Sequence, residues 1–120
     1  MNRILVIDDD PQVREMLNLI LEWAGYEVIL ASDGKGGIRL FHENPVGLVI
    51  TDIVMPDKDG LETIMELRRF SPGVKIIAIS GGGKICGEEY LNVARILGVE
   101  KTLSKPFKID DILEAVREVF

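Results

Sequence analysis

The sequence contains a single cysteine and no long apolar run. Cys86 has no second cysteine with which to form a disulfide within the chain, which is typical of proteins kept in a reducing compartment. The longest purely apolar runs are only a few residues, whereas a membrane-spanning helix needs about 20. No apolar signal-peptide core precedes the acidic residues 8–10. We therefore expect a cytoplasmic protein that is not associated with a membrane.

Positive charge is outnumbered by negative charge. Lys and Arg number 14 against 20 Asp and Glu, which gives a net charge of −6 and a pI near 4.8. Proteins that bind the nucleic-acid backbone need a basic surface, so the composition argues against direct binding of nucleic acid. Part of the acidic excess gathers at residues 8–10 and at Asp52, where carboxylates would repel one another unless a cation or a lysine lies among them. This clustering predicts a bound metal ion.

What the chain does have is a regular alternation of two patterns. Its 120 residues are 47% hydrophobic and 28% charged, as in a globular domain, and we expect one domain that spans residues 1–120. Short apolar runs rich in β-branched residues, typical of buried strands, alternate with segments of helical periodicity. Five such units require parallel strands with right-handed crossovers, so the sequence predicts a doubly wound α/β fold. The expected strands are 3–7, 26–31, 46–51, 74–79 and 101–104.

Polar or charged residues stand at four of the predicted strand ends. Carboxyl ends of parallel strands meet at one edge of the sheet, which is where open α/β sheets bind ligands. We therefore expect these side chains to share one rim although they are far apart in the sequence. The residues are Asp8 and Asp9 after the first strand, Asp52 after the third, Ser80 after the fourth and Lys105 after the fifth.

This set of residues suits phosphate chemistry. Carboxylates are hard oxygen ligands of the kind that bind Mg²⁺. Asp52 could attack a phosphorus centre to give an aspartyl phosphate, while the metal ion and Lys105 neutralise the phosphoryl oxygens. Ser80 could donate a hydrogen bond to the phosphoryl group and pull its loop toward the site, which would make it a switch as well as a ligand.

Each of these residues, taken alone, has a plainer interpretation. An aspartate after a strand is more often a turn or helix-cap residue, and a lone lysine or serine is more often a surface group. For Asp10 the cap interpretation prevails, because Pro11 suits the first position of a helix. For the others the joint pattern prevails, since five suitable residue types at four strand ends are hard to obtain by accident.

Two other classes of ligand site fit the sequence poorly. Residues 81–84 read Gly-Gly-Gly-Lys, but they follow the fourth predicted strand, lack the spacing of a Walker A loop and precede Ile85 in place of its Ser or Thr. Residues 55–66 place acidic side chains at several positions of an EF-hand loop, but Met55 removes its first oxygen ligand. Nucleotide and calcium binding are therefore weaker hypotheses than phosphoryl transfer.

Four motifs stand at the strand ends: ILVIDDD, ITDIVMPDKDG, IAIS and the triplet Lys105, Pro106 and Phe107. Together they resemble the response-regulator receiver domains of two-component signalling, and the resemblance covers the whole chain. It implies a flavodoxin-like, five-stranded parallel sheet of order 2-1-3-4-5 with helices on both faces.

The resemblance also implies a role for each rim residue. Asp52 would be the phosphoacceptor, Ser80 the switch hydroxyl and Lys105 the phosphate contact. The cofactor would be Mg²⁺, held at the acidic end of the site. Its implied ligands are Asp9, Asp52, the backbone carbonyl of Val54 and, through water, Asp8.

Such a domain is a signalling module and not a conventional enzyme, although it could catalyse its own dephosphorylation. The resemblance implies a sensor histidine kinase or a phosphotransfer protein as the phosphoryl donor. Phosphorylation would switch the surface near the fourth helix, the fifth strand and the last helix toward an unknown downstream protein, and a phosphorylation-dependent dimer is left open. The alternative is a receiver-like interaction domain that works without phosphorylation, against which the intact acidic set argues.

The sequence departs from the pattern of many receivers in two places. Thr102, three residues before Lys105, occupies the position where many receivers carry an aromatic switch residue, so a different readout has to be considered. The loop 81–87 is longer and richer in glycine than the usual connection, which suggests mobility there.

Aromatic residues are few, at 6% of the chain. We expect Trp23, Tyr26 and Phe120 in the core or at its boundary, because aromatic side chains bury large apolar areas. The one histidine, His42, lies on a helical segment away from the predicted rim, and we expect a surface residue without a catalytic role.

Overall fold

The computed structural model describes residues 2–53, 60–80 and 92–120. Two of the features expected above, the Val54 carbonyl and the loop 81–87, lie outside the described residues. The strands form one parallel sheet of order β2-β1-β3-β4-β5, which confirms the predicted fold class and strand order. They are β1 (Arg3–Ile7), β2 (Glu27–Ala31), β3 (Leu48–Asp52), β4 (Lys75–Ser80) and β5 (Lys101–Ser104).

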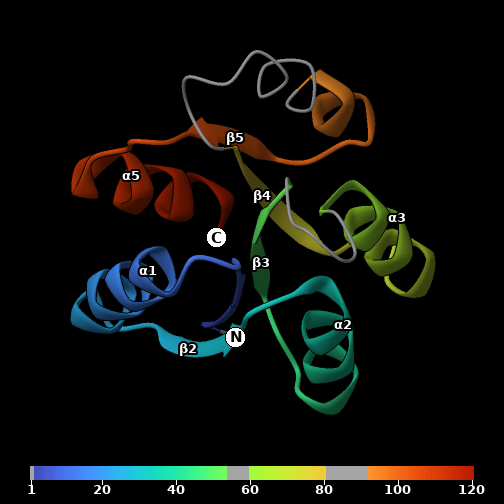
Figure 1. Cartoon of the computed structure of the whole chain (residues 1–120), viewed down its shortest axis with the longest axis horizontal. Helices are drawn as coiled ribbons and strands as arrows, with labels where there is room; N and C mark the ends of the chain where they lie inside the picture. The colour runs from blue at the N-terminus through green and yellow to red at the C-terminus, as the bar shows by residue number, and fades with distance from the viewer. Residues whose placement is uncertain (1, 54–59, 81–91) are drawn as a thin grey trace.

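Helices cover both faces of this sheet. Figure 1 shows α1 and α5 together on one side of the strands and α2 and α3 on the other. None of the helices in the described ranges combines the length and the apolar character of a membrane-spanning segment. The helices are α1 (Pro11–Trp23), α2 (Gly34–Glu43), α3 (Gly60–Phe70) and α5 (Ile109–Val119), and residues 92–96 are also helical.

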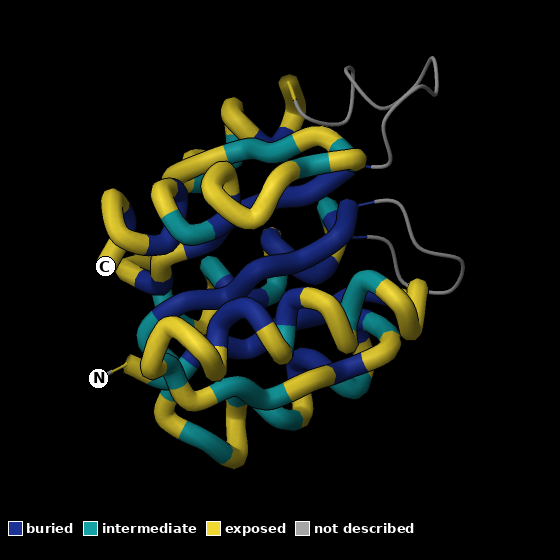
Figure 2. The backbone as a smooth tube through the Cα atoms, turned by 90° about the vertical axis from the view of Figure 1, so that its left-hand side faces the viewer, coloured by how far each residue is buried: buried dark blue, intermediate teal, exposed yellow. Residues whose placement is uncertain are grey.

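The core consists of two apolar layers, one on each face of the sheet. Successive residues of a strand point to opposite faces, so each strand contributes to both layers. Ile4 and Val6 belong to the layer beneath α1 and α5, whereas Leu5 and Ile7 belong to the layer beneath α2 and α3. Figure 2 shows the buried strands enclosed between more exposed helices. Burial on both faces explains why the strands read as near-continuous apolar runs.

Helix α1 begins where the sequence predicts. The Asp10 side chain accepts a hydrogen bond from the Gln12 N–H at 2.9 Å and Pro11 is the first helical residue, which confirms the cap interpretation. After α1, Gly25 adopts φ +99°, a left-handed conformation that favours glycine. Asp10 is therefore used in capping the helix.

Three strand boundaries differ from the prediction. The second strand starts one residue later than expected, and the third and fourth strands are displaced toward the carboxyl end. Asp52 and Ser80 are consequently the last residues of β3 and β4 and do not follow them. Both remain in register with a neighbouring strand, Asp52 with Ile79 and Ser80 with Ser104, which holds their backbones in the sheet.

The prediction for Trp23 is wrong, because this side chain is 82% exposed. It lies on the flank of α1, away from the buried face that carries Leu17 and Leu21. The boundary assignment is confirmed for Tyr26, which stacks on Phe120 with ring centroids 5.4 Å apart.

Gly60 brings the start of α3 into contact with the end of β3. A Cβ atom at this position would lie 2.2 Å from the Asp52 carbonyl oxygen and 2.3 Å from the Ile53 Cα. The Gly60 N–H also donates to the Ile53 carbonyl at 3.1 Å. Both neighbours are backbone atoms at the edge of the sheet, so a side chain at position 60 would displace the segment that carries Asp52.

We predict that Gly60→Ala destabilises the protein by about 1–3 kcal/mol, the usual cost of overpacking. Alanine normally stabilises a helix relative to glycine by about 1 kcal/mol. A loss of stability in Gly60→Ala would therefore indicate the steric contact, whereas a gain would reflect helix propensity alone. Urea denaturation should measure it, with Gly73→Ala as the matched control, since nothing lies within 4 Å of a Cβ atom there. A Gly60→Ala protein as stable as the wild type would contradict the contact.

Candidate functional site

Asp8, Asp52 and Lys105 come together at the carboxyl edge of the sheet. Asp8 directly follows β1, Asp52 ends β3 and Lys105 directly follows β5. Lys105 Nζ lies 3.0 Å from Asp8 Oδ2 and 3.3 Å from Asp52 Oδ2. The parallel sheet therefore assembles one cation and two carboxylates from positions up to 97 apart in the sequence (105 − 8).

The backbone of Lys105 is fixed beside β4. Its N–H donates to the Ser80 carbonyl at 2.8 Å, and the peptide bond to Pro106 is cis. The side chain is 20% exposed. Burial lowers the pKa of the Lys105 ammonium, but its ion pairs with Asp8 and Asp52 outweigh burial, so the net pKa shift is upward. Lys105 therefore stays positively charged at neutral pH.

Asp8 is fully buried and only partly compensated. Its Oδ1 accepts from the Asp10 N–H at 2.9 Å, and its backbone carbonyl accepts from Arg14 Nη1 at 2.8 Å. Its Oδ2 is in ion-pair contact with Lys105 but has no hydrogen-bond partner among the described residues. Burial raises the pKa of Asp8, and the Asp10 and Lys105 contacts offset this only in part. A further cation would stabilise the charged carboxylate.

Asp9 completes a group of three carboxylates. One oxygen each from Asp8, Asp9 and Asp52 lie within 4.8 Å of one another. Mg²⁺ binds oxygen ligands at about 2.1 Å, so opposite ligands are about 4 Å apart, and it usually keeps several waters. The spacing, the oxygen ligands and the Asp8 oxygen without a hydrogen-bond partner fit a magnesium ion. Among the described residues, the predicted carboxylate ligands are thus brought together.

Ser80 presents a buried hydroxyl without a partner. The residue is 1% exposed, and its Oγ makes no hydrogen bond with the described part of the chain. A buried unpaired hydroxyl costs about 1–3 kcal/mol, and such groups in native structures often belong to functional sites. Ser80 lies one residue beyond Ile79, the register partner of Asp52, so its hydroxyl is at the same edge as the carboxylates.

Sequence reasoning missed two arginine contacts, one with the backbone of Asp8 and one with β5. Arg14 holds the Asp8 carbonyl, and Arg95 Nη2 donates to Thr102 Oγ1 at 3.1 Å. Arg14 lies near the amino end of α1, where a basic residue is unfavourable for the helix dipole, and this is a signal from which a contact outside the helix could have been predicted. No pattern in the sequence predicts the Arg95–Thr102 contact, because it joins the helical residues 92–96 to β5.

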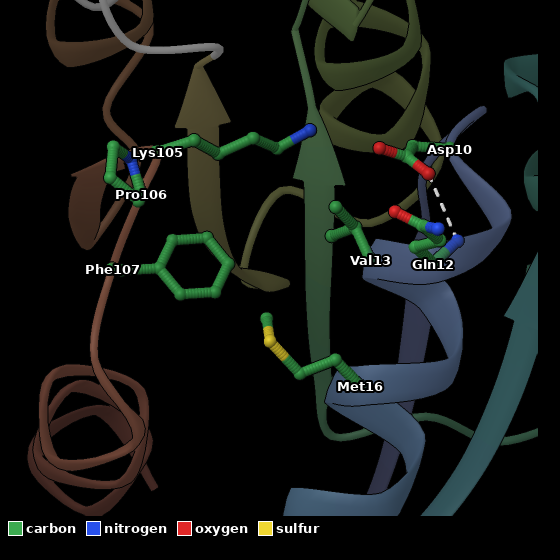
Figure 3. Close-up of a pocket in the computed structure, with 7 residues that line it drawn as sticks. All are labelled: Asp10, Gln12, Val13, Met16, Lys105, Pro106 and Phe107. Atoms are coloured by element: carbon green, nitrogen blue, oxygen red, sulfur yellow. Dashed lines mark hydrogen bonds between the residues drawn. The ribbon is translucent and has the colours of Figure 1, made fainter.

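A groove of about 470 Å³ opens beside Lys105. In Figure 3, α1 borders one side and the segment after β5 the other, with Met16 and Phe107 facing each other. The apolar walls end at the Lys105 ammonium, so the groove provides a route from the surface to the charged edge. Its lining residues are Asp10, Gln12, Val13, Met16, Lys105, Pro106 and Phe107.

Residues 4–117 match the family model described as the response regulator receiver domain. The response regulator receiver protein CpdR of Brucella abortus is 34% identical over 119 residues, which cover 99% of this chain and 97% of CpdR. The transcriptional regulatory protein GlrR of Escherichia coli is 33% identical over 113 residues. These residues cover 94% of this chain but 25% of GlrR, so the chain spans only a part of some relatives.

Solved structures show the same similarity. A response regulator receiver domain protein from Clostridium thermocellum has a TM-score of 0.91 and 30% identity, and the match covers 99% of this chain and 94% of that one. The response regulator TrrA from Thermotoga maritima, solved in complex with Mg²⁺ and BeF, has a TM-score of 0.88 and 32% identity over the full length of both chains. Fold, edge residues and relatives agree, and the chain belongs to the response regulator receiver domain family.

Proposed function

We propose that the chain accepts a phosphoryl group on Asp52 from a histidine kinase or phosphotransfer protein and thereby acts as a signalling module. The observation that carries the proposal is the position of Lys105 Nζ, within 3.3 Å of both buried carboxylates. A lysine and a carboxylate at this edge supply the charge that a transferred phosphoryl group needs and the oxygen that would attack it. We propose that residues 1–120 act as one such domain, in the cytoplasm.

In the proposed reaction an Asp52 carboxylate oxygen attacks the phosphorus of a phosphohistidine. The P–N bond breaks, its electron pair stays on the imidazole nitrogen, and that nitrogen regains its proton from solvent. Lys105 already lies against Asp52 and contacts a phosphoryl oxygen in the product. Asp52 is 4% exposed, so little water screens the charges around it. The attraction between the Lys105 ammonium and the phosphoryl oxygen is therefore stronger than it would be in water.

Magnesium would complete the acidic end of the site. We propose that Asp9, Asp52 and the Val54 carbonyl bind Mg²⁺ directly and that Asp8 binds it through water. When bound, the ion neutralises phosphoryl oxygens that the carboxylates would otherwise repel. The three clustered carboxylates support this assignment, and TrrA, a relative at 32% identity, was solved with Mg²⁺.

Ser80 would convert phosphorylation into a change of surface. Its buried hydroxyl lacks an acceptor in the described structure, and a phosphoryl oxygen on Asp52 would provide one. We propose that the resulting movement alters the surface around residues 92–96, β5 and α5, where a downstream protein would bind. In this chain the Arg95–Thr102 contact, in place of an aromatic side chain, links two of these elements.

We predict that Mg²⁺ and a small-molecule phosphodonor add one phosphoryl group to the wild-type chain and none to Asp52→Asn, because the amide is not a nucleophile. Intact mass spectrometry measures the adduct. Asp110→Asn is the control, since it removes an exposed carboxylate on α5 and should leave labelling unchanged. Labelling that survives Asp52→Asn would refute the assignment, and a wild-type chain without label would support a receiver-like interaction domain.

We predict that Asp8→Asn raises the melting temperature in magnesium-free buffer at pH 7 and removes most of the stabilisation by Mg²⁺. The raised pKa means that the charged Asp8 carboxylate destabilises the folded state above its unfolded pKa. The gain should shrink as pH falls through the raised pKa, where wild-type Asp8 becomes neutral.

Thermal denaturation with and without MgCl₂ tests this prediction. Asp10→Asn is the matched control, because asparagine caps a helix as well as aspartate and the magnesium response should persist. An Asp8→Asn protein that is less stable without magnesium, or that responds to magnesium like the wild type, would contradict the role of the buried carboxylate.

We predict that Ser80→Ala still takes up the phosphoryl group but shows smaller amide shifts in two-dimensional NMR spectra when Mg²⁺ and beryllofluoride are added. The substitution removes the hydroxyl that would bind the phosphoryl group and leaves Asp52 in place. Ser104→Ala, an exposed serine at the end of β5, is the control. Equal shifts in Ser80→Ala and wild type would exclude Ser80 as the switch.

A further inference from the structure

Thr51 is the one polar residue among the four residues of β3 that precede Asp52. Leu48, Val49 and Ile50 are apolar, and all four side chains are fully buried. A hydroxyl in such a place needs a hydrogen-bond partner, because burying it without one destabilises the folded state. The partner of this hydroxyl belongs to the proposed phosphoacceptor itself.

The Thr51 hydroxyl donates to the backbone carbonyl of Asp52. Thr51 Oγ1 lies 3.0 Å from the carbonyl oxygen, and the contact is buried. Thr51 lies two residues after Val49, so its side chain is on the same face of the sheet, in the apolar layer beneath α2 and α3. A β-branched side chain has few rotamers, and packing in this layer restricts it further. The hydroxyl is therefore held in one direction.

This contact lies where β3 leaves the sheet. The register of β3 with β1 ends at the pair Ile7 and Thr51, whereas the register with β4 continues to the pair Asp52 and Ile79. Within the described sheet, Asp52 thus has a register partner on the side of β4 and none on the side of β1. The Thr51 hydroxyl adds a hydrogen bond at the residue where the pairing with β1 has stopped.

The peptide unit between Asp52 and Ile53 is held at both of its polar atoms. Its carbonyl accepts from Thr51, and its N–H, which belongs to Ile53, donates to the Ile79 carbonyl at 2.9 Å. Gly60 borders the same carbonyl, since a Cβ atom there would lie 2.2 Å from the oxygen. Because a peptide unit is planar, these contacts fix the backbone torsion that follows the Asp52 Cα. They therefore help to fix the direction of the Asp52 side chain.

The direction of this side chain matters at the edge of the sheet. Asp52 Oδ2 lies 3.3 Å from Lys105 Nζ, and one Asp52 oxygen lies within 4.8 Å of oxygens of Asp8 and Asp9. A carboxylate oxygen that attacks phosphorus has to meet it in line. Misplacing a reacting group by about 1 Å can cost on the order of a hundredfold in rate.

We infer that Thr51 is a positioning residue for the phosphoacceptor, because its hydroxyl orients Asp52 through the backbone. The inference rests on the proposed phosphoryl transfer to Asp52. It gives the two branches of the threonine side chain different roles. The hydroxyl holds the Asp52 carbonyl, whereas the methyl group fills the apolar layer beneath α2 and α3.

Two substitutions separate these roles. Thr51→Val keeps the shape of the side chain and removes the hydroxyl, so the rate of phosphorylation by Mg²⁺ and a small-molecule phosphodonor should fall about three- to tenfold. Thr51→Ser keeps the hydroxyl and removes the buried methyl group. Its rate should stay within about twofold of the wild type although its melting temperature falls by about 3–6 °C.

Timed intact mass spectrometry measures the rate, at saturating Mg²⁺ and well below the melting temperature of every variant. Val49→Ala is the matched control, because it removes buried apolar groups from the same strand and layer without removing a hydrogen bond to Asp52. It should lower the melting temperature and leave the rate unchanged. The rate should therefore follow the hydroxyl at position 51 and not the stability of the fold.

Three results would overturn the inference. The first is a Thr51→Val protein that is labelled at the wild-type rate. The second is a loss of rate in Thr51→Ser or Val49→Ala as large as that in Thr51→Val, since the rate would then follow packing. In both cases the wild type still takes up the phosphoryl group. The third, a wild-type chain without label, would overturn the proposed function and this inference with it.

Discussion

The arrangement of the site depends on one interaction, the placement of the Lys105 ammonium between two buried carboxylates. Asp8 and Asp52 could not be buried side by side as uncompensated charges, because desolvation and mutual repulsion would both favour their neutral forms. Lys105 supplies the opposite charge from the end of β5, two strands away from β3. The sheet order, the caps and the contact at Gly60 all serve to bring these three residues to one edge.

That interaction leaves part of the site unsatisfied. One Asp8 oxygen and the Ser80 hydroxyl are buried without hydrogen-bond partners among the described residues. The Asp8 oxygen has an ion-pair contact with Lys105 and can still accept a hydrogen bond or bind a further cation, and the Ser80 hydroxyl can donate to an acceptor. A metal ion and a phosphoryl group would satisfy both, so the unliganded fold carries a cost that its ligands would relieve. Stability and function are therefore opposed at this edge, as is common at active sites.

Much of this could be read from the sequence. Alternating patterns predicted the parallel sheet, and the polar strand ends predicted which residues share an edge; the strand order came only from the family resemblance. Strand boundaries moved by one or two residues because Asp52 and Ser80 remain paired in the sheet. The burial predicted for Trp23 was wrong because an aromatic side chain on the flank of a helix can be either buried or exposed. The helical spacing of apolar residues does not distinguish the two.

The lysine at the centre of the site directly follows the most exposed strand of the described sheet. β5 is an edge strand of four residues, none of them buried, whereas every residue of β3 is buried. Local opening would normally start at such an edge. Separating β5 from β4 would also withdraw Lys105 and leave two desolvated like charges together. The ion pairs of Lys105 therefore raise the free energy needed to separate β5 from β4 above the value that the slight burial of β5 alone would give.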